Sequence, residues 1–180
     1  MKFINIIGTT GSGKSTFARQ LAQKQQLHYI ELDNLLWLDD WQESPHDEFF
    51  CKLKSSMDAA QAGWVIDNLY TRSVDMIWSK LDTVIWLDYS FSINLYRLTK
   101  RTLWRALSRK RLWEDSNNRE SWKMMFSKKS IFLWMLQKYP QNKQRYLAMM
   151  QHPDYQHIRF IHLTSPQQAA AFLQQIEAKQ

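Results

Sequence analysis

A short glycine-rich stretch near the start of the chain constrains the fold more than any other feature. A mostly apolar run, residues 3–7, leads into residues 8–15, Gly-Thr-Thr-Gly-Ser-Gly-Lys-Ser, which fit G-x-x-x-x-G-K-[ST] at every fixed position. Helically spaced apolar residues follow at once, so the loop lies between a predicted buried strand and a predicted helix N-terminus. Backbone N–H groups there can surround phosphate oxygens. We therefore expect a nucleoside triphosphate site formed by Gly8, Thr9, Thr10, Gly11, Ser12, Gly13, Lys14, Ser15 and Thr16.

Two side chains of this loop have distinct expected roles. Lys14 can reach the β- and γ-phosphates, which makes it a candidate catalytic residue. The Ser15 hydroxyl can enter the coordination shell of Mg²⁺. The motif therefore predicts a magnesium ion as well as a nucleotide.

Charge and cysteine content indicate what kind of partner and which compartment to expect for the protein. The net charge of +7 is local, because residues 97–129 carry eleven Lys or Arg and three acidic residues, so we expect an anion near that segment. The single cysteine, Cys51, excludes an intramolecular disulfide and favours a reducing compartment. We find no apolar stretch near 18 residues and no signal-peptide pattern, so we expect a cytoplasmic protein without a membrane partner.

The rest of the chain alternates apolar runs with helical patterns. Continuous apolar strands between helices indicate an α/β fold with a parallel sheet covered on both faces. Ser44 and Ser165 each begin a capping-box pattern, and Tyr139-Pro140 predicts a break between two helices. No linker divides the chain, so we expect one domain over residues 1–180. The predicted strands are 3–7, 28–32, 64–66, 83–87 and 159–163.

Three of the predicted strands end in an aspartate, at Asp33, Asp67 and Asp88. The carboxyl ends of parallel strands share one edge of a sheet, where Gly8 also lies. Asp67 is the candidate magnesium-side carboxylate, and the alternative is a cap of the following turn. Asp33 could hold an acceptor hydroxyl or act as its base, or it could equally cap a turn. Asp88 leads directly into a helical pattern, which favours a capping role.

A stripe of arginines marks the long helix predicted for residues 92–111. Arg97, Arg101, Arg105 and Arg109 recur every four residues, and each like-charged pair costs about 0.2–0.5 kcal/mol in an isolated helix. Such a stripe indicates a compensating anion, and a phosphoryl group in transfer is one. The alternative is a solvated basic face. The residues expected on the opposite, core-facing side are Leu95, Tyr96, Leu103, Ala106 and Leu107.

Tryptophans interleave with these cations, which raises a second possibility. Trp104, Trp113 and Trp122 could stack on nucleic-acid bases beside the positive charges. Aromatic residues at helical spacing are more often part of a core. Nucleic acid therefore stays an open but less favoured partner.

With these residues in place, the chain resembles the adenylate-kinase-like P-loop kinases. Residues 63–72, Gly-Trp-Val-Ile-Asp-Asn-Leu-Tyr-Thr-Arg, are similar to the stretch in those kinases that ends in a phosphate-binding arginine. Within that group the chain most closely resembles the bacterial topology modulation (FlaR-related) proteins. The similarity lies in Leu32-Asp33, in the two tryptophans Trp37 and Trp41, and in residues 84–88.

The resemblance implies a fold and several residue roles. It implies a three-layer P-loop sandwich with a five-stranded sheet of order 2-3-1-4-5, a basic helical lid at about residues 97–129, and Mg-ATP as donor. By position, Arg72 would meet an acceptor phosphate, and Arg101 and Arg105 would be lid arginines. The chain departs from the pattern at Asn68, where a glycine is usual, and at Asp39-Asp40, where Pro-Gly is usual.

These observations lead to one functional hypothesis and one rival. We expect transfer of the γ-phosphoryl group of Mg-ATP to a small acceptor, either a nucleotide or a hydroxyl metabolite, bound at about residues 33–67. Lys14, Asp33, Arg101 and Arg105 would be catalytic and Ser15 and Asp67 would hold the metal, while Asp33, Trp37, Trp41 and Arg72 would bind the acceptor. The rival is an ATP-gated module that binds nucleic acid or protein without kinase activity. The acceptor, hydrolysis as an alternative to transfer, and the oligomeric state stay open.

Overall fold

The computed structural model describes residues 1–108, 112–113, 116–119 and 130–176. Within these residues, five strands form one sheet of order β2-β3-β1-β4-β5, and every neighbouring pair is parallel. This confirms the expected α/β fold class and the expected sheet order 2-3-1-4-5. The strands are β1 (Phe3–Gly8), β2 (His28–Glu31), β3 (Trp64–Asp67), β4 (Thr83–Leu87) and β5 (Arg159–Leu163).

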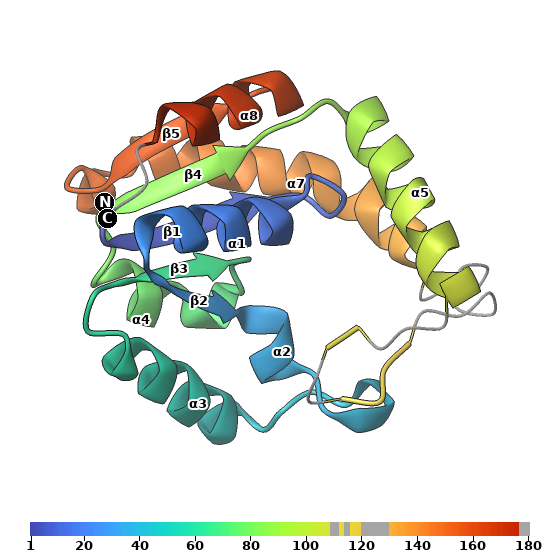
Figure 1. Cartoon of the computed structure of the whole chain (residues 1–180), viewed down its shortest axis with the longest axis horizontal. Coiled ribbons are helices and arrows are strands. Elements are labelled where there is room, and N and C mark those ends of the chain that lie inside the picture. Colours follow the sequence, from blue (N-terminus) through green and yellow to red (C-terminus); the bar gives the residue numbers. More distant parts are fainter. Residues whose placement is uncertain (109–111, 114–115, 120–129, 177–180) are drawn as a thin grey trace.

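Helices cover both faces of the sheet, as Figure 1 shows. Successive side chains of a strand point to opposite faces, so a strand of continuous apolar residues needs a covering layer on each side. Ile4 and Ile6 of β1 pack with α1 (Lys14–Gln25) and α8 (Pro166–Gln175) on one face. Ile7 packs on the other face with residues of α3 (His46–Ala59), α4 (Val74–Trp78) and α7 (Ile131–Gln151). The central strands β1, β3 and β4 are therefore buried on both sides, which explains their continuous apolar sequences.

The two predicted helix starts have different outcomes. Ser165 caps α8 as expected, because its Oγ accepts a hydrogen bond from the amide of Gln168 at 3.2 Å. Helix α3 instead has Pro45 as its N-cap, without a side-chain cap. The Ser44 hydroxyl is buried without a hydrogen-bond partner among the described residues, while its backbone N–H donates to the carbonyl of Leu36 at 2.7 Å. The predicted cap at Ser44 is therefore wrong, because this residue is held against Leu36 and its hydroxyl does not reach the first turn of α3.

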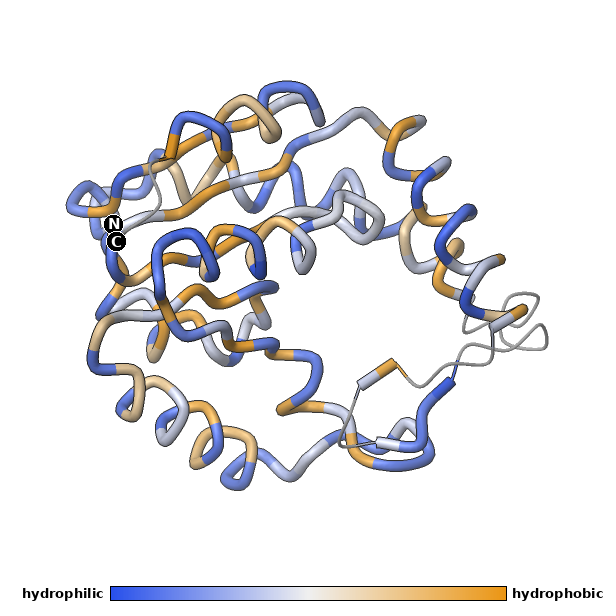
Figure 2. The backbone as a smooth tube through the Cα atoms, viewed as in Figure 1, coloured by the Kyte–Doolittle hydropathy of each residue, from blue (hydrophilic) through white to orange (hydrophobic). Residues whose placement is uncertain are grey.

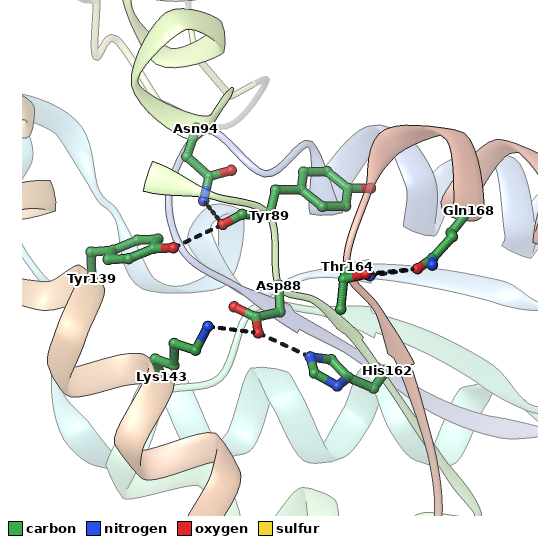
Figure 3. A network of polar contacts seen from close by, with 8 residues as sticks. All are labelled: Asp88, Tyr89, Asn94, Tyr139, Lys143, His162, Thr164 and Gln168. Atoms are coloured by element: carbon green, nitrogen blue, oxygen red, sulfur yellow. Dashed lines mark hydrogen bonds and ion pairs between the residues drawn. The ribbon is translucent and has the colours of Figure 1, made fainter. Parts of the chain in front are cut away.

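Asp88 ties β4 to two other elements instead of capping the next helix. Its Oδ2 lies 2.9 Å from Nε2 of His162 on β5 and 3.3 Å from Nζ of Lys143 on α7, as Figure 3 shows. The His162 ring also stacks on the Trp86 ring, with centroids 4.3 Å apart. The predicted capping role of Asp88 is therefore wrong, because a histidine and a lysine from distant segments contact its carboxylate.

The start of α5 (Phe91–Ser108) is fixed by the neighbouring residue, Tyr89. The carbonyl oxygen of Tyr89 accepts hydrogen bonds from Nδ2 of Asn94 and from Oη of Tyr139, both at 3.1 Å (Figure 3). These bonds join the first turn of α5 to α7. The arginines farther along α5 are thereby carried on a helix that is anchored at its base.

Helix α5 buries a different face from the one expected. Its buried residues are Asn94, Leu98, Thr102 and Ala106, while Tyr96, Leu103 and Leu107 are 68%, 37% and 72% exposed. The core assignment is therefore wrong for those three. The cause is that α5 packs against the glycine-rich loop, where a Cβ on Gly11 would lie 2.4 Å from the Asn94 carbonyl oxygen. Figure 2 shows apolar and polar residues alternating along this helix.

Helix α7 runs without a break through Pro140, where the sequence predicts two helices. Proline removes one helical donor, and the carbonyl of Leu136 loses its usual partner. Leu136 is more than half exposed, so water can replace that donor. Tyr139 and Lys143 anchor the helix on both sides of the proline. None of the helices in the described residues, α7 included, has the length and apolar character needed to span a membrane.

Candidate active site

The glycine-rich loop turns sharply from β1 into α1. The amide of Ser12 donates to the carbonyl of Thr9 at 3.1 Å, and Gly11 and Gly13 adopt φ values of 85° and 86°. These values lie in the left-handed region, which glycine occupies without a steric penalty. Gly13 is the N-cap of α1, and no side-chain oxygen caps that helix. The amides of its first turn are therefore available to an anion.

Arg97 lies directly beside this loop. A Cβ on Gly13 would come 2.9 Å from Nη2 of Arg97, and the guanidinium lies over the Tyr89 ring, 5.6 Å from its centroid. The first arginine of the stripe is thus held at the N-terminus of α1. Arg97 was predicted as part of the stripe but not as a site residue, and its four-residue spacing from Arg101 was the signal that pointed to it.

Asp67 is a buried carboxylate at the edge where the loop begins. It is 2% exposed and pairs in register with Ile6 of β1. Burial raises the pKa of Asp67 from its usual 3.8 to about 6, while the Ser15 hydroxyl and the Lys14 ammonium act in the opposite direction. Its Oδ1 atom is buried without a hydrogen-bond partner. A buried oxygen of this kind is costly unless a ligand or an ordered water meets it.

The surroundings of Asp67 fit a magnesium ion held mainly by a nucleotide. Mg²⁺ prefers oxygen ligands and in such sites takes one or two from the protein, with phosphates and waters completing the shell. Ser15 and Asp67 offer a hydroxyl and a carboxylate. Across the described part of the chain, no group of three or more His, Cys, Asp or Glu residues could hold a metal.

Asp33 lies in the first turn of α2 (Leu32–Leu36), two positions after the end of β2, whereas the sequence predicts a strand up to residue 32. Its Oδ1 accepts hydrogen bonds from the Tyr70 hydroxyl and from Nδ2 of Asn68, the latter at 2.9 Å. Asn68 adopts φ 73°, and its carbonyl accepts from Nδ2 of Asn5 at 2.8 Å. The carboxylate is thereby oriented by residues that follow β3. The turn-cap alternative for Asp33 does not account for these two contacts.

Arg72 lies in a partly apolar setting. Its guanidinium carbon is 4.7 Å from the centroid of the Phe49 ring, and Nη2 is 3.7 Å from Oε2 of Glu43. That separation is too long for a hydrogen bond, and Nη2 is buried without one. Arg72 therefore presents a buried donor group that an acidic group of a ligand could satisfy.

A single cavity of about 910 Å³ connects the glycine-rich loop with the region around Asp33. Asp67 is buried and is not part of the cavity lining, and Gly11 faces α5 instead. Arg109 and much of the predicted lid lie outside the described residues. The predicted site residues that line the cavity are Gly8, Thr10, Lys14, Ser15, Asp33, Trp37, Trp41, Arg72, Arg101 and Arg105.

Helix α7 supplies cavity residues that the sequence analysis missed. Lys138, Asn142 and Arg145 line the same space from one face of this helix. Their spacing of four and three residues is a helical signal. The predicted break at Pro140 divided this pattern, so it was not recognised. Tyr70 and Trp113 are further wall residues outside the predicted acceptor region, and Glu43 lies within that region but was not among the predicted site residues.

A comparison with protein families identifies the group. The shikimate kinase family model matches residues 10–178, nearly the whole chain. The chain belongs to the shikimate kinase family. No curated protein matches the chain significantly.

Solved structures agree with this shikimate kinase family assignment at the level of fold. A sugar kinase from Janibacter sp. HTCC2649 is 17% identical, with 97% of this chain and 93% of that chain covered and a TM-score of 0.54. A gluconokinase from Sinorhizobium meliloti 1021 is 16% identical, with 97% and 94% covered and a TM-score of 0.50. At these identities the likeness establishes a shared fold.

As a shikimate kinase family member, the chain is a P-loop kinase-like protein. The prediction of a P-loop kinase-like protein is thereby confirmed. The narrower resemblance to adenylate-kinase-like and topology modulation proteins stays a prediction.

Proposed function

We propose that this protein transfers the γ-phosphoryl group of Mg-ATP to a hydroxyl group of a small acceptor. One observation carries the proposal: the same cavity is lined by Lys14 and Ser15 of the glycine-rich loop and by Asp33 of α2. A nucleotide with its phosphates on the loop would place its γ-phosphate in the cavity that Asp33 also lines. This placement supports direct transfer between two bound substrates.

The proposed step assigns each side chain a defined task. The acceptor oxygen forms a bond to the γ-phosphorus while the bond from phosphorus to the β,γ-bridging oxygen breaks, and ADP leaves. The hydroxyl proton passes to the Asp33 carboxylate, which Tyr70 and Asn68 hold in place. Lys14 binds the phosphates whose charge increases during transfer. Mg²⁺, held by Ser15 and through water by Asp67, would neutralise charge on the β- and γ-oxygens.

The position of the arginine stripe favours transfer over the nucleic-acid rival. Arg101 and Arg105 line the cavity, where a migrating phosphoryl group could meet them. A surface that binds nucleic acid would instead present these cations outward. Oligonucleotide affinity measured from low to high salt tests the rival. Strong binding at low salt, weakening steeply as salt rises, would support it over the kinase.

The acceptor side of the cavity indicates the kind of molecule that binds there. Arg72 offers its buried Nη2 group to an anion, and Asp33 offers an acceptor for a hydroxyl proton. Trp37 and Trp41 provide apolar ring surface beside them. A small hydroxyl compound with a carboxylate or phosphate group fits this combination. Shikimate and gluconate have this character, as do nucleoside monophosphates.

The deciding experiment incubates the protein with Mg-ATP and a panel of acceptors and detects phosphorylated products by mass spectrometry. The panel contains shikimate, gluconate, simple sugars and nucleoside monophosphates. We expect one class to be phosphorylated. Lys14→Ala should abolish the product, whereas Lys54→Ala, at an exposed position of α3, should not. Product formation that survives in Lys14→Ala, or no product with any acceptor, would contradict the proposal.

A further inference from the structure

Two carboxylates lie next to each other where β2 and β3 end. Glu31 and Asp67 are partners in the register of these parallel strands, so their side chains point to the same face of the sheet. Adjacent negative charges repel each other, and the repulsion is strong here because Asp67 is almost completely buried. Each of the two carboxylates therefore needs a partner of its own.

Arg19 of α1 is the partner of Glu31. Nη2 of Arg19 lies 2.6 Å from Oε2 of Glu31. The guanidinium carbon of Arg19 also lies 5.2 Å from the centroid of the Tyr29 ring, which is within the range of a cation–π contact. Tyr29 precedes Glu31 by two positions on β2, so both side chains point to the face that α1 covers. Arg19 therefore pairs with Glu31 and holds the Tyr29 ring at the same time.

The hydroxyl group of Tyr29 is the neighbour of Asp67. Tyr29 is paired in register with Val65, two positions before Asp67 on β3 and on the same face. The hydroxyl oxygen of Tyr29 and Oδ1 of Asp67 are both buried, and neither makes a hydrogen bond of ordinary geometry with a described residue. Burial raises the pKa of Tyr29, and the Asp67 carboxylate raises this pKa further through its charge and as an acceptor for the hydroxyl. The two buried groups are therefore within reach of each other.

Tyr29 and Asp67 can satisfy each other. A buried hydroxyl and a buried carboxylate oxygen are costly unless each meets a partner. The hydroxyl donates and the carboxylate accepts, either directly or through one ordered water. The same carboxylate also interacts with the Ser15 hydroxyl and the Lys14 ammonium. Asp67 is thereby held by the glycine-rich loop and by β2 together.

We propose that Tyr29 is a positioning residue for the magnesium site, where its hydroxyl fixes the orientation of the Asp67 carboxylate. The inference rests on the Mg-ATP binding of the proposed function. Groups that orient a metal-binding carboxylate contribute to metal affinity although they do not touch the metal. Without the hydroxyl, the carboxylate loses a fixed contact, and fewer of its orientations reach the water ligands of Mg²⁺.

The test is a double-mutant cycle in the full chain. Tyr29→Phe removes the hydroxyl and keeps the ring that Arg19 contacts. Asp67→Ala removes the proposed acceptor, and a third variant carries both changes. Tyr155→Phe, at a tyrosine that packs on Trp78, is the control and should behave as the unsubstituted chain does.

Two readouts report on the metal rather than on catalysis. The first is the ratio of the Kd values of the fluorescent ATP analogue mant-ATP measured without and with Mg²⁺. The second is the binding of Mn²⁺, in place of Mg²⁺, to the complex of the chain with mant-ATP, followed by loss of the electron paramagnetic resonance signal of the free ion. We expect Tyr29→Phe to lower the ratio and the Mn²⁺ affinity about tenfold and to leave mant-ATP binding without metal unchanged. In the Asp67→Ala background, Tyr29→Phe should have no further effect.

The possible results separate the role of Tyr29 from the kinase activity. A tyrosine that only packs would weaken mant-ATP binding with and without metal alike, or would change neither. Either result, or a metal-specific loss that persists in the Asp67→Ala background, would overturn the inference even if the acceptor panel gives a product. A metal-specific loss that disappears in that background would support it even if no acceptor is phosphorylated. If mant-ATP does not bind the unsubstituted chain, the metal-side role of Tyr29 is overturned together with the proposed function.

Discussion

Nδ2 of Asn68 donates to Oδ1 of Asp33 at 2.9 Å and so joins the chain after β3 to the helix after β2. Asn68 is left-handed at φ 73°, a conformation that asparagine tolerates better than most residues. Asn68 therefore has two roles: its side chain orients the proposed base, Asp33, and its backbone occupies a left-handed conformation. The two roles can be separated by substitution.

Replacement of Asn68 by glycine or by alanine should have the same effect on activity and different effects on stability. Both changes remove the hydrogen bond to Asp33, so both should lower kcat for phosphoryl transfer. Alanine is also strained at this φ, so Asn68→Ala should unfold at lower urea, with a free energy of unfolding about 1 kcal/mol below that of Asn68→Gly. Equal stability of the two variants would show that the left-handed backbone is unimportant.

Asp33 and Tyr70 should affect the chemical step rather than ATP binding. Asp33→Asn removes the proposed base and should lower kcat by about 100-fold or more, with little change in mant-ATP affinity. Burial and the Asp33 charge raise the pKa of Tyr70, so its hydroxyl stays a donor throughout the working pH range. Tyr70→Phe should lower kcat by about tenfold through misplacement of Asp33. Tyr155→Phe, at a tyrosine that packs on Trp78, is the control.

Asp67 should make the ligand-free protein less stable as the pH rises. Its pKa is about 6 in the folded chain and near 3.8 when exposed, so the folded state keeps the proton to higher pH. Its favourable contribution is complete below pH 3.8 and is lost as the pH rises through 6. Asp67→Asn should therefore be more stable than the unsubstituted chain by about 2–3 kcal/mol at pH 8.

The same variant should gain little at pH 4, where Asp67 of the folded chain is largely protonated and so carries little buried charge. Urea denaturation at the two pH values measures the difference. Asp67→Asn should also weaken the dependence of mant-ATP binding on Mg²⁺, because a carboxylate is lost from the proposed metal site. A stability gain that does not change with pH would exclude titration of Asp67 as its cause.

Arg101 and Arg105 should contribute mainly to the transition state. Arg101→Ala and Arg105→Ala should each lower kcat by about 100-fold, with a smaller change in KM for Mg-ATP. Lys100→Ala removes an exposed cation from the same helix and should leave both constants unchanged. If all three variants lose activity alike, the effect comes from the overall charge of α5 and not from residues in the cavity.

The amino-acid sequence by itself determined the five strands and the position of the phosphate-binding loop between a strand and a helix. The glycine-rich motif, the continuous apolar strands and the cap at Ser165 are local patterns. Each reflects the backbone conformation or the burial of one short segment, which neighbouring residues largely decide. The fold class and the five strands were therefore predictable.

Only the tertiary structure decided which distant segments meet. The face that α5 buries depends on its packing against Gly11, and the continuity of α7 through Pro140 depends on the anchors at Tyr139 and Lys143. The partners of Asp33, which are Asn68 and Tyr70, lie 35 and 37 positions away along the chain. Local periodicity carries no information on such pairs, because it does not record which surfaces pack together in the folded chain.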